Sequence, residues 1–301
     1  MSIAMQRPKK RTDGWVAFVY LLPAFLFLAV YIGYPIVSTV YYSFFDWSGI
    51  SPKREYVGLD NYIDLVNDKI IGLALGHNLV FLIFGLIAVL PFAFLVAMLL
   101  TRGAVRARKL LRTVYFFPVV LNLVVIGTLW GLFYNPQRGL VNTVLRSVGL
   151  DQMAQGWLGQ QNTALPALLL VSLWMRAGYY IVIYMAGIKG LPPDVWDALA
   201  IDGAGFLRSA VSVVVPMLRP VIGSSAAMAV ISSINDFGMV WVMTRGGPVR
   251  ATEILGTYMY KEAFSQFHMG YGSAIVLVML ALSLVLSVAQ IRALERGLVE
   301  Y

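Results

Sequence analysis

The sequence predicts an all-α protein that crosses a membrane six times. Of its 301 residues, 59% are apolar and 13% are charged, whereas average soluble domains contain about 45–50% and about 25%. The mean hydropathy is +0.75. A soluble fold of this length needs more polar surface than these residues supply. The apolar runs are continuous, while strands of a membrane barrel would alternate apolar and polar residues, so we expect helices.

Six segments are long enough to span a membrane. A spanning helix needs about 20 mostly apolar residues. Four charge-free runs meet this length, and two further runs each contain one charge, Arg176 and Asp236. The first run is about twice as long as the apolar core of a signal peptide and lacks a small-residue cleavage site, so we expect it to be retained. The predicted spans are residues 15–37, 78–101, 114–135, 165–186, 221–243 and 271–291.

The distribution of Lys and Arg predicts that both ends of the chain lie inside the cell (N-in, C-in). With this orientation the inner segments carry 14 Lys and Arg residues, and the longer outer segments carry 8. Cytoplasmic loops are enriched in these residues. The net charge of +8 then reflects loops that face anionic lipid, and we expect no nucleic-acid partner. The densest basic segment, residues 102–113, contains Arg102, Arg106, Arg108, Lys109 and Arg112.

The chain is predicted to form one membrane domain over residues 1–301. The longest stretch outside the spans, about residues 187–219, is too short for a separate domain. The absence of Cys excludes disulfides, thiolate metal sites and Cys nucleophiles, and two His are too few for a His-rich metal site. The sequence also lacks the Gly-rich motif with Lys-Ser/Thr that holds ATP phosphates. We therefore expect no cofactor in this chain.

The most informative segment, residues 193–205, lies on the predicted inner side between the fourth and fifth spans. Pro193 can open a helix, where its missing N–H costs nothing. Asp194 and Asp197 favour the first turns through the helix dipole, and Gly203 can end the helix. From this pattern the segment is either a lever that docks into a groove of another protein or a helix that lies on lipid. Its apolar face contains Val195, Trp196 and Leu199.

These residues resemble the cytoplasmic signature of membrane subunits of binding-protein-dependent ABC importers. That signature reads Glu-Ala-Ala, three residues, Gly, nine residues, Ile, any residue, Leu-Pro. Ala198, Gly203 and Pro216 match it. The remaining positions differ conservatively, with Asp for Glu, Leu for Ala, and Val for Ile and Leu: Asp197, Leu199, Val213 and Val215.

Further segments extend the resemblance over nearly the whole chain and narrow it to the carbohydrate-importing branch. Each is a weak match alone, but their order and spacing are similar to that branch. They include Tyr34-Pro35, Gly58 to Tyr62, Asn135-Pro136 and Thr244 to Pro248.

The resemblance implies a type I ABC importer permease fold in a bacterial or archaeal plasma (inner) membrane. The implied partners are a second permease subunit, two ATPase subunits that bind ATP and Mg²⁺, and an extracytoplasmic sugar-binding protein. Segment 193–205 is the implied coupling helix, which ATP-driven closure of the ATPases moves to open the sugar path outward. Its implied ATPase contacts are Asp194, Trp196, Asp197, Ala198, Leu199, Asp202, Gly203 and Ala204.

Two charged residues lie within predicted spans. Charges at such depth cost at least about 2.5–3.5 kcal/mol and usually face a cavity or a partner. Arg176 lies near the middle of the fourth span and Asp236 in the outer third of the fifth. From a rise of 1.5 Å per residue, their depths differ by only about 6 Å. We predict that they pair, directly or through sugar hydroxyls, beside the transport path; the alternative is a purely structural ion pair.

The resemblance also implies where substrate is bound. Arg176 stands where the maltose-type subunit has Gly, and a guanidinium could bind a carboxylate or phosphate, so glycerol phosphate or an acidic sugar is an alternative cargo. If Asp236 neutralises Arg176, a neutral di- or oligosaccharide is favoured. The sequence does not identify the sugar. The implied substrate positions are Met175, Arg176, Tyr179, Ser232, Asn235 and Asp236.

Asn122 is a lone polar residue in the third predicted span, flanked by leucines. A polar side chain at this depth forms either a hydrogen bond to a neighbouring helix or a contact with substrate in the path. Both interpretations stay open from the sequence.

Two other functional classes fit less well. An ion-coupled secondary carrier tends to have inverted repeats and broken helices, and neither is evident in the sequence. A membrane-embedded enzyme would need an intramembrane Asp pair, a Ser–His pair or a zinc motif, whereas the spans contain the charges Arg176 and Asp236. We therefore expect a transport subunit and not an enzyme.

Overall fold

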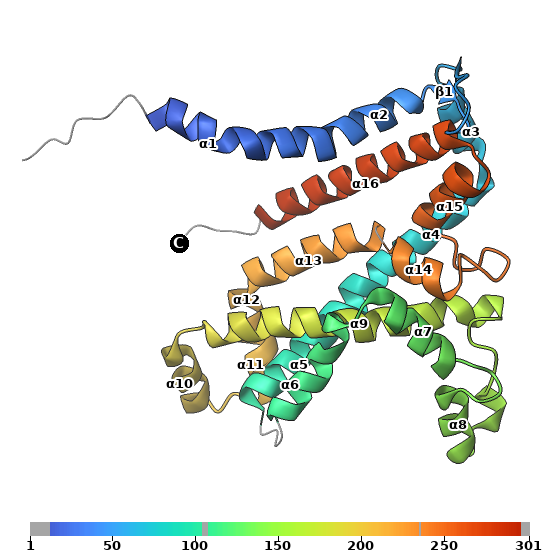
Figure 1. Ribbon diagram of the computed structural model, residues 1–301. Coiled ribbons are helices and arrows are strands. Elements are labelled where there is room, and N and C mark those ends of the chain that lie inside the picture. Colours follow the sequence, from blue (N-terminus) through green and yellow to red (C-terminus); the bar gives the residue numbers. More distant parts are fainter. Residues whose placement is uncertain (1–12, 104–107, 235, 296–301) are drawn as a thin grey trace, which may run out of the picture.

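Long helices dominate the computed structural model, which describes residues 13–103, 108–234 and 236–295 (Figure 1). Within those ranges, four helices are long and apolar enough to cross a membrane. Two further pairs of helices are long and apolar enough when each pair is taken together, but each pair is sharply bent. The number of possible crossings is therefore six if each bent pair is one crossing. The four unbroken segments are Phe18–Tyr42, Lys69–Arg102, Gln161–Lys189 and Met269–Gln290.

The first long helix consists of α1 (Asp13–Leu28), the π-helical turn η1 (Ala29–Gly33) and α2 (Tyr34–Tyr42). It continues past the predicted end at residue 37. Part of α2 packs against α16, but the spanning segment as a whole buries almost none of its apolar surface within this chain. A helix that is apolar on all sides and unburied suits contact with lipid or with another subunit.

A small hairpin and a short helix follow the first long helix. β1 (Phe45–Asp46) and β2 (Glu55–Tyr56) pair antiparallel, with Phe45 opposite Tyr56. α3 (Asp60–Asn67) packs against α16. These elements lie at one end of the bundle (Figure 1).

The second long helix consists of α4 (Lys69–Phe84), η2 (Gly85–Val89) and α5 (Leu90–Arg102). It begins nearer the hairpin than the predicted start at residue 78. Asp68 accounts for this start, because its carboxylate accepts a hydrogen bond from the Ile70 backbone N–H at 2.8 Å and caps the helix.

The third predicted span, residues 114–135, is broken into two helices. This region forms α6 (Arg108–Val120) and α7 (Leu123–Phe133), with a bend of 109° between them. Asn122 has an extended backbone, and its side chain accepts from the Val124 N–H at 2.9 Å to cap α7. Pro118, near the end of α6, has no N–H to continue the helical pattern.

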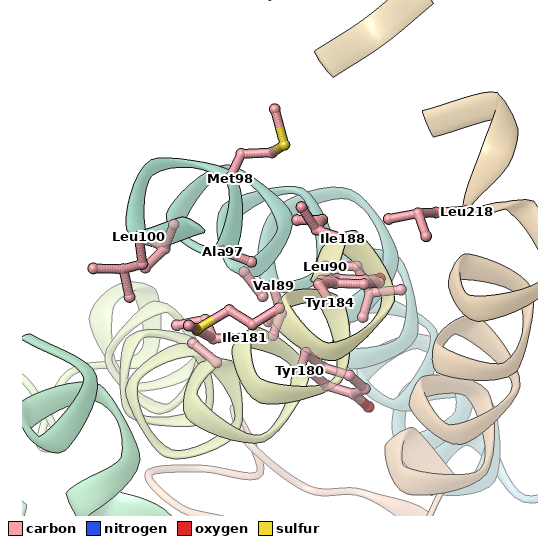
Figure 2. Packing of buried hydrophobic residues seen from close by; sticks show 14 of the residues in the cluster. Val89, Leu90, Ala97, Met98, Leu100, Tyr180, Ile181, Tyr184, Ile188 and Leu218 are labelled. Carbon is pink, nitrogen blue, oxygen red and sulfur yellow. The ribbon is translucent and has the colours of Figure 1, made fainter. Parts of the chain in front are cut away.

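After α8 (Leu140–Ser147) and the short η3 (Asp151–Met153), the chain enters α9 (Gln161–Lys189). α9 packs against both α5 and α6. At its crossing with α6, a Cβ on Gly178 would lie 2.1 Å from the Tyr115 carbonyl oxygen, so only Gly permits this approach. Figure 2 shows the apolar core between α5 and α9, which includes Val89, Leu90, Ala97, Leu100, Tyr180, Ile181, Tyr184 and Ile188.

The fifth predicted span, residues 221–243, is also interrupted. Its helix ends at Ile234, and a new helix begins at Phe237. A further bend of 79° lies at Leu218, where Pro220 follows and cannot donate a backbone hydrogen bond. The elements that follow α9 are α10 (Pro193–Ile201), α11 (Phe206–Ser209), η4 (Ala210–Val214), α12 (Val215–Met217), α13 (Arg219–Ile234) and α14 (Phe237–Met243).

The chain ends with α15 (Leu255–Tyr260), η5 (Lys261–Ser265) and the long α16 (Met269–Glu295). The start of α1, the end of α16 and α10 lie at one end of the bundle, and the β-hairpin, α3 and α15 lie at the other (Figure 1). The described elements next to three of the predicted inner segments thus lie at the same end. Which end faces the cytoplasm stays a prediction.

Candidate functional site

An ion pair lies inside the bundle, at the break between α13 and α14. Nη2 of Arg176, near the middle of α9, donates to Oδ1 of Asp236, the N-cap residue of α14. Asp236 is 3% exposed and the Arg176 side chain is 18% exposed. Charges this far from water are tolerated as a pair far better than singly. The direct pairing predicted from their depths is therefore present in the structure.

A cavity of about 470 Å³ opens beside this pair. Its walls come from four helices, α6, α7, α9 and α13, and from the turn between α6 and α7. Four predicted substrate positions line it: Met175, Arg176, Tyr179 and Ser232. Other walls are apolar, including Leu121, Leu123 and Met228. A mostly apolar cavity with a few polar groups is typical of a small-molecule site.

The other predicted path residues have different outcomes. The Asn122 side chain caps α7, and among the described residues it shows no hydrogen bond to another helix; its two neighbours, Leu121 and Leu123, line the cavity. Asn235 lies outside the described residues. Oδ2 of Asp236 is buried and, within the described part of the chain, has no hydrogen-bond partner. The Tyr179 hydroxyl donates to Sδ of Met228 at 3.4 Å.

The predicted helix in segment 193–205 is α10, which lies at the end of the bundle where α1 begins and α16 ends. Pro193 is its first residue and Asp194 lies in its first turn. Gly203 ends it in the left-handed conformation, with φ of 61°, which Gly adopts without strain. The Ala204 N–H then donates to the Leu199 carbonyl at 3.0 Å. The Pro and Gly signals thus place both ends of this helix.

The apolar face of α10 turns toward its own chain. Trp196 packs on the core between α5 and α9, and the Arg102 guanidinium stacks over its ring at 3.8 Å. Arg102 is the last residue of α5, so this stack joins α10 to the second long helix. The outward side is acidic and apolar and consists of the exposed Asp194, Asp197, Ala198 and Ile201.

Sequence reasoning missed a buried polar cluster at the opposite end. Asn78 and Glu253 are 6% and 1% exposed and bond to several segments. A signal for Asn78 was available, because it is a polar residue in an otherwise apolar run, like Asn122. The partners of Asn78 lie 155 and 177 residues away, which no local pattern reveals.

Comparison with known protein families decides the class of this chain. Residues 89–299 match the family described as binding-protein-dependent transport system inner membrane component. The chain belongs to this family. The matched region contains α10, the Arg176–Asp236 pair and the cavity. This permease is therefore a transport component of a membrane and not a catalytic enzyme.

Individual relatives agree with this assignment over nearly the full length of the permease. A probable ABC transporter permease, YurN of Bacillus subtilis, is 34% identical over 94% of this chain and 97% of its own. NgcF of Streptomyces coelicolor, a permease of a diacetylchitobiose uptake system, is 31% identical over 93% of this chain and 83% of its own. In a solved bacterial ABC transporter that imports the acidic polysaccharide alginate, one chain matches with a TM-score of 0.82 and 19% identity, covering 96% of this permease and 98% of that chain. The fold is thus that of ABC importer permeases.

Proposed function

We propose that this permease is one of two membrane-spanning subunits of an ATP-driven importer, and that it moves a sugar delivered by an extracytoplasmic binding protein. Relatives named for sugar uptake support this proposal, among them NgcF and the multiple sugar-binding transport permease MsmF of Streptococcus mutans. One solved relative of the fold is a complex with a periplasmic protein that holds an alginate pentasaccharide. The observation that carries the proposal is the cavity beside the buried ion pair.

The favoured cargo is a neutral di- or oligosaccharide. The cavity volume of about 470 Å³ lies in the range of about 300–1,000 Å³ that ligand pockets occupy. Asp236 already neutralises Arg176, so the site carries little net charge. The partly exposed Arg176 and Tyr179 can offer a donor group and a flat ring face to a sugar.

An acidic sugar or glycerol phosphate is the second candidate cargo. It is favoured by one observation, the guanidinium that reaches the cavity wall. An anion binding there would compete with Asp236 for Arg176, and the buried carboxylate would then lose its partner. This cost is the reason for placing a neutral sugar first.

We propose α10 as the coupling helix that docks on an ATPase subunit. Its exposed face offers two carboxylates and the apolar Ile201, which fits a groove with basic and apolar walls. The two ATPase subunits would supply ATP and Mg²⁺ binding, and the complex would lie in a bacterial or archaeal plasma membrane with α10 facing the cytoplasm.

The test is reconstitution of the permease with its second subunit, ATPase and binding protein in vesicles. We expect uptake that requires ATP and the binding protein. We also expect neutral oligosaccharides to inhibit this uptake more strongly than acidic ones. Inhibition only by acidic sugars or glycerol phosphate would move the assignment to the second cargo. Uptake by the purified permease alone under an ion gradient would overturn the importer assignment in favour of a secondary carrier.

A further inference from the structure

A buried junction joins three segments that are far apart in the chain. Asn78 of α4 uses both ends of its amide: Nδ2 donates to the Ser233 carbonyl oxygen at 2.9 Å, and Oδ1 accepts from the Leu255 N–H at 3.0 Å. Beside it, Nδ1 of His77 lies 2.7 Å from the Glu253 carbonyl oxygen. The second long helix is thereby bonded to the end of α13 and the start of α15.

Both partners of Asn78 are backbone groups that a helix end leaves unsatisfied. α13 ends at Ile234, so the carbonyl of Ser233 lies in a last turn without a following helical N–H. Leu255 is the first residue of α15, where the N–H has no preceding helical carbonyl. All three residues are buried. One amide thus satisfies two buried backbone groups that would otherwise destabilise the site.

The end of α13 lies close to the ion pair along the chain. Asp236 follows Ser233 by three residues and occupies the N-cap position of α14, so the end of α13 restricts where its carboxylate can lie. Asn78 holds that helix end by the Ser233 carbonyl. The junction is therefore one short segment away from the Arg176–Asp236 pair.

On its other side, the junction holds the loop between α14 and α15, residues 244–254, which we term the outer loop. The buried carboxylate of Glu253 accepts from Oγ1 of Thr257 at 2.7 Å and from Nζ of Lys261 at 2.5 Å. Gly246, with φ of 83°, passes directly over this carboxylate, and a Cβ there would lie 2.6 Å from Oε1. Glu253 therefore ties the outer loop to α15 and η5, and the hydrogen bond from the Leu255 N–H continues this connection to Asn78.

We propose that Asn78 is a positioning residue that links the outer loop to the Arg176–Asp236 pair, so that a protein docked on the loop influences access to the cavity. This inference rests on the proposed function and deepens it, because the docked protein is the extracytoplasmic sugar-binding protein. Asn78 touches neither member of the pair and acts through the Ser233 carbonyl.

The test compares Asn78 variants in the complete transporter reconstituted in vesicles. Asn78→Leu keeps the side-chain size and removes both hydrogen bonds, whereas Asn78→Asp keeps an acceptor for the Leu255 N–H and loses the donor to Ser233. We expect Asn78→Leu to lower the stimulation of ATP hydrolysis by loaded binding protein, and the uptake rate, by about tenfold, as the loss of one or two buried hydrogen bonds predicts. ATP hydrolysis without binding protein should change less than about twofold. Asn78→Asp should show the same pattern, because a carboxylate cannot donate to the Ser233 carbonyl oxygen.

The matched control is Asn67→Leu at the exposed end of α3, where the amide donates to the Ile63 carbonyl oxygen of the same helix, and it should behave as wild type. Wild-type stimulation in both Asn78 variants would overturn the inference, and so would an equal loss of basal and stimulated hydrolysis, which indicates a merely structural role. If Asn78→Leu does not assemble, Asn78→Asp decides by the same criteria. If the wild-type complex itself neither responds to a binding protein nor takes up sugar, the proposed function fails, and the inference fails with it.

Discussion

The two ends of this permease hold their connecting segments in different ways. The outer loop, residues 244–254, is fixed by buried hydrogen bonds and an ion pair through Asn78, Glu253 and Lys261. α10, at the opposite end, packs through apolar side chains and the stack of Arg102 on Trp196. In the part of the chain that the structure describes, no side chain of α10 forms a hydrogen bond.

This difference indicates that the outer loop is held rigidly, whereas α10 can shift more easily. Buried hydrogen bonds are directional and costly to break without replacement, whereas apolar and cation–π contacts tolerate sliding. A segment that must follow a moving partner is therefore better held in the second way. The ion pair and its cavity lie between the two ends.

The largest expected effect follows from breaking the element between the two ends. Arg176→Ala leaves the Asp236 carboxylate buried and unpaired, at a cost of about 3–5 kcal/mol, and we expect uptake to fall by at least about 100-fold. Arg176→Met combined with Asp236→Leu should restore folding, because apolar replacement of a buried pair is often neutral. If the pair serves transport, this double variant stays inactive, and the exchange Arg176→Asp with Asp236→Arg recovers part of the uptake. A fully active Met/Leu variant would show that the pair is only structural.

The next effect tests whether α10 is the end that docks on the ATPase. Ile201 is 86% exposed, so Ile201→Asp should cost the fold less than about 0.5 kcal/mol. We expect it to weaken co-purification of the ATPase by about tenfold, because an apolar anchor in an interface would become charged. Val249→Asp changes a residue of similar exposure, 81%, in the outer loop and serves as the control. Equal retention of the ATPase by both variants would contradict the assignment of α10.

A smaller effect is expected from the stack that joins α10 to α5. Arg102→Leu removes a cation–π contact of about 0.5–2 kcal/mol. Because the lost energy is small, we expect the amount of ATP hydrolysed for each sugar moved to rise by about two- to fivefold. Arg102→Lys keeps the cation and should retain most of the coupling. The measurement is the ratio of ATP hydrolysis to uptake in vesicles, and an unchanged ratio in Arg102→Leu would mean that another contact transmits the movement.

The smallest effect concerns the fixed end and its pH dependence. Burial of Asp68 raises the pKa of its carboxyl, but hydrogen bonds from Tyr258, the Ile70 N–H and Tyr271, with the charge of Arg250, outweigh this and lower the pKa below the usual 3.8. The stabilisation is therefore complete above about pH 4 and is lost as the pH falls through the lowered pKa. Thermal unfolding of the purified permease from pH 7 to pH 3 should show less acid destabilisation in Asp68→Asn than in wild type. Identical pH profiles of thermal unfolding in the two proteins would show that Asp68 does not contribute to the stability of this end.

The ion pair and the ends of α10 could be predicted from the sequence because both follow from local rules. Helix rise sets the depth of Arg176 and Asp236 in neighbouring antiparallel spans. Pro193 and Gly203 mark helix ends by backbone chemistry alone. The direction in which the apolar face of α10 points could not be predicted from the sequence. Residue spacing defines the face, but tertiary packing decides what covers it.

The broken spans and the buried junction could not be predicted with the same rules. Hydropathy measures how much apolar chain is present and not its direction, so residues 114–135 and 221–243 were predicted as single helices. The combination of Pro118 with a good N-cap residue, Asn122, carried a signal for the first break. The Asn78 junction depends on contacts across more than half of the chain, which require the fold itself.

The position of Asp236 between two helices separates its ion pair from the ends of those helices. α13 ends before Asp236, and within the described residues the Asp236 carboxylate forms no capping hydrogen bond with α14. Replacing the pair with apolar residues therefore removes no hydrogen bond that holds either helix end, so lost uptake in such a variant would report on the pair itself.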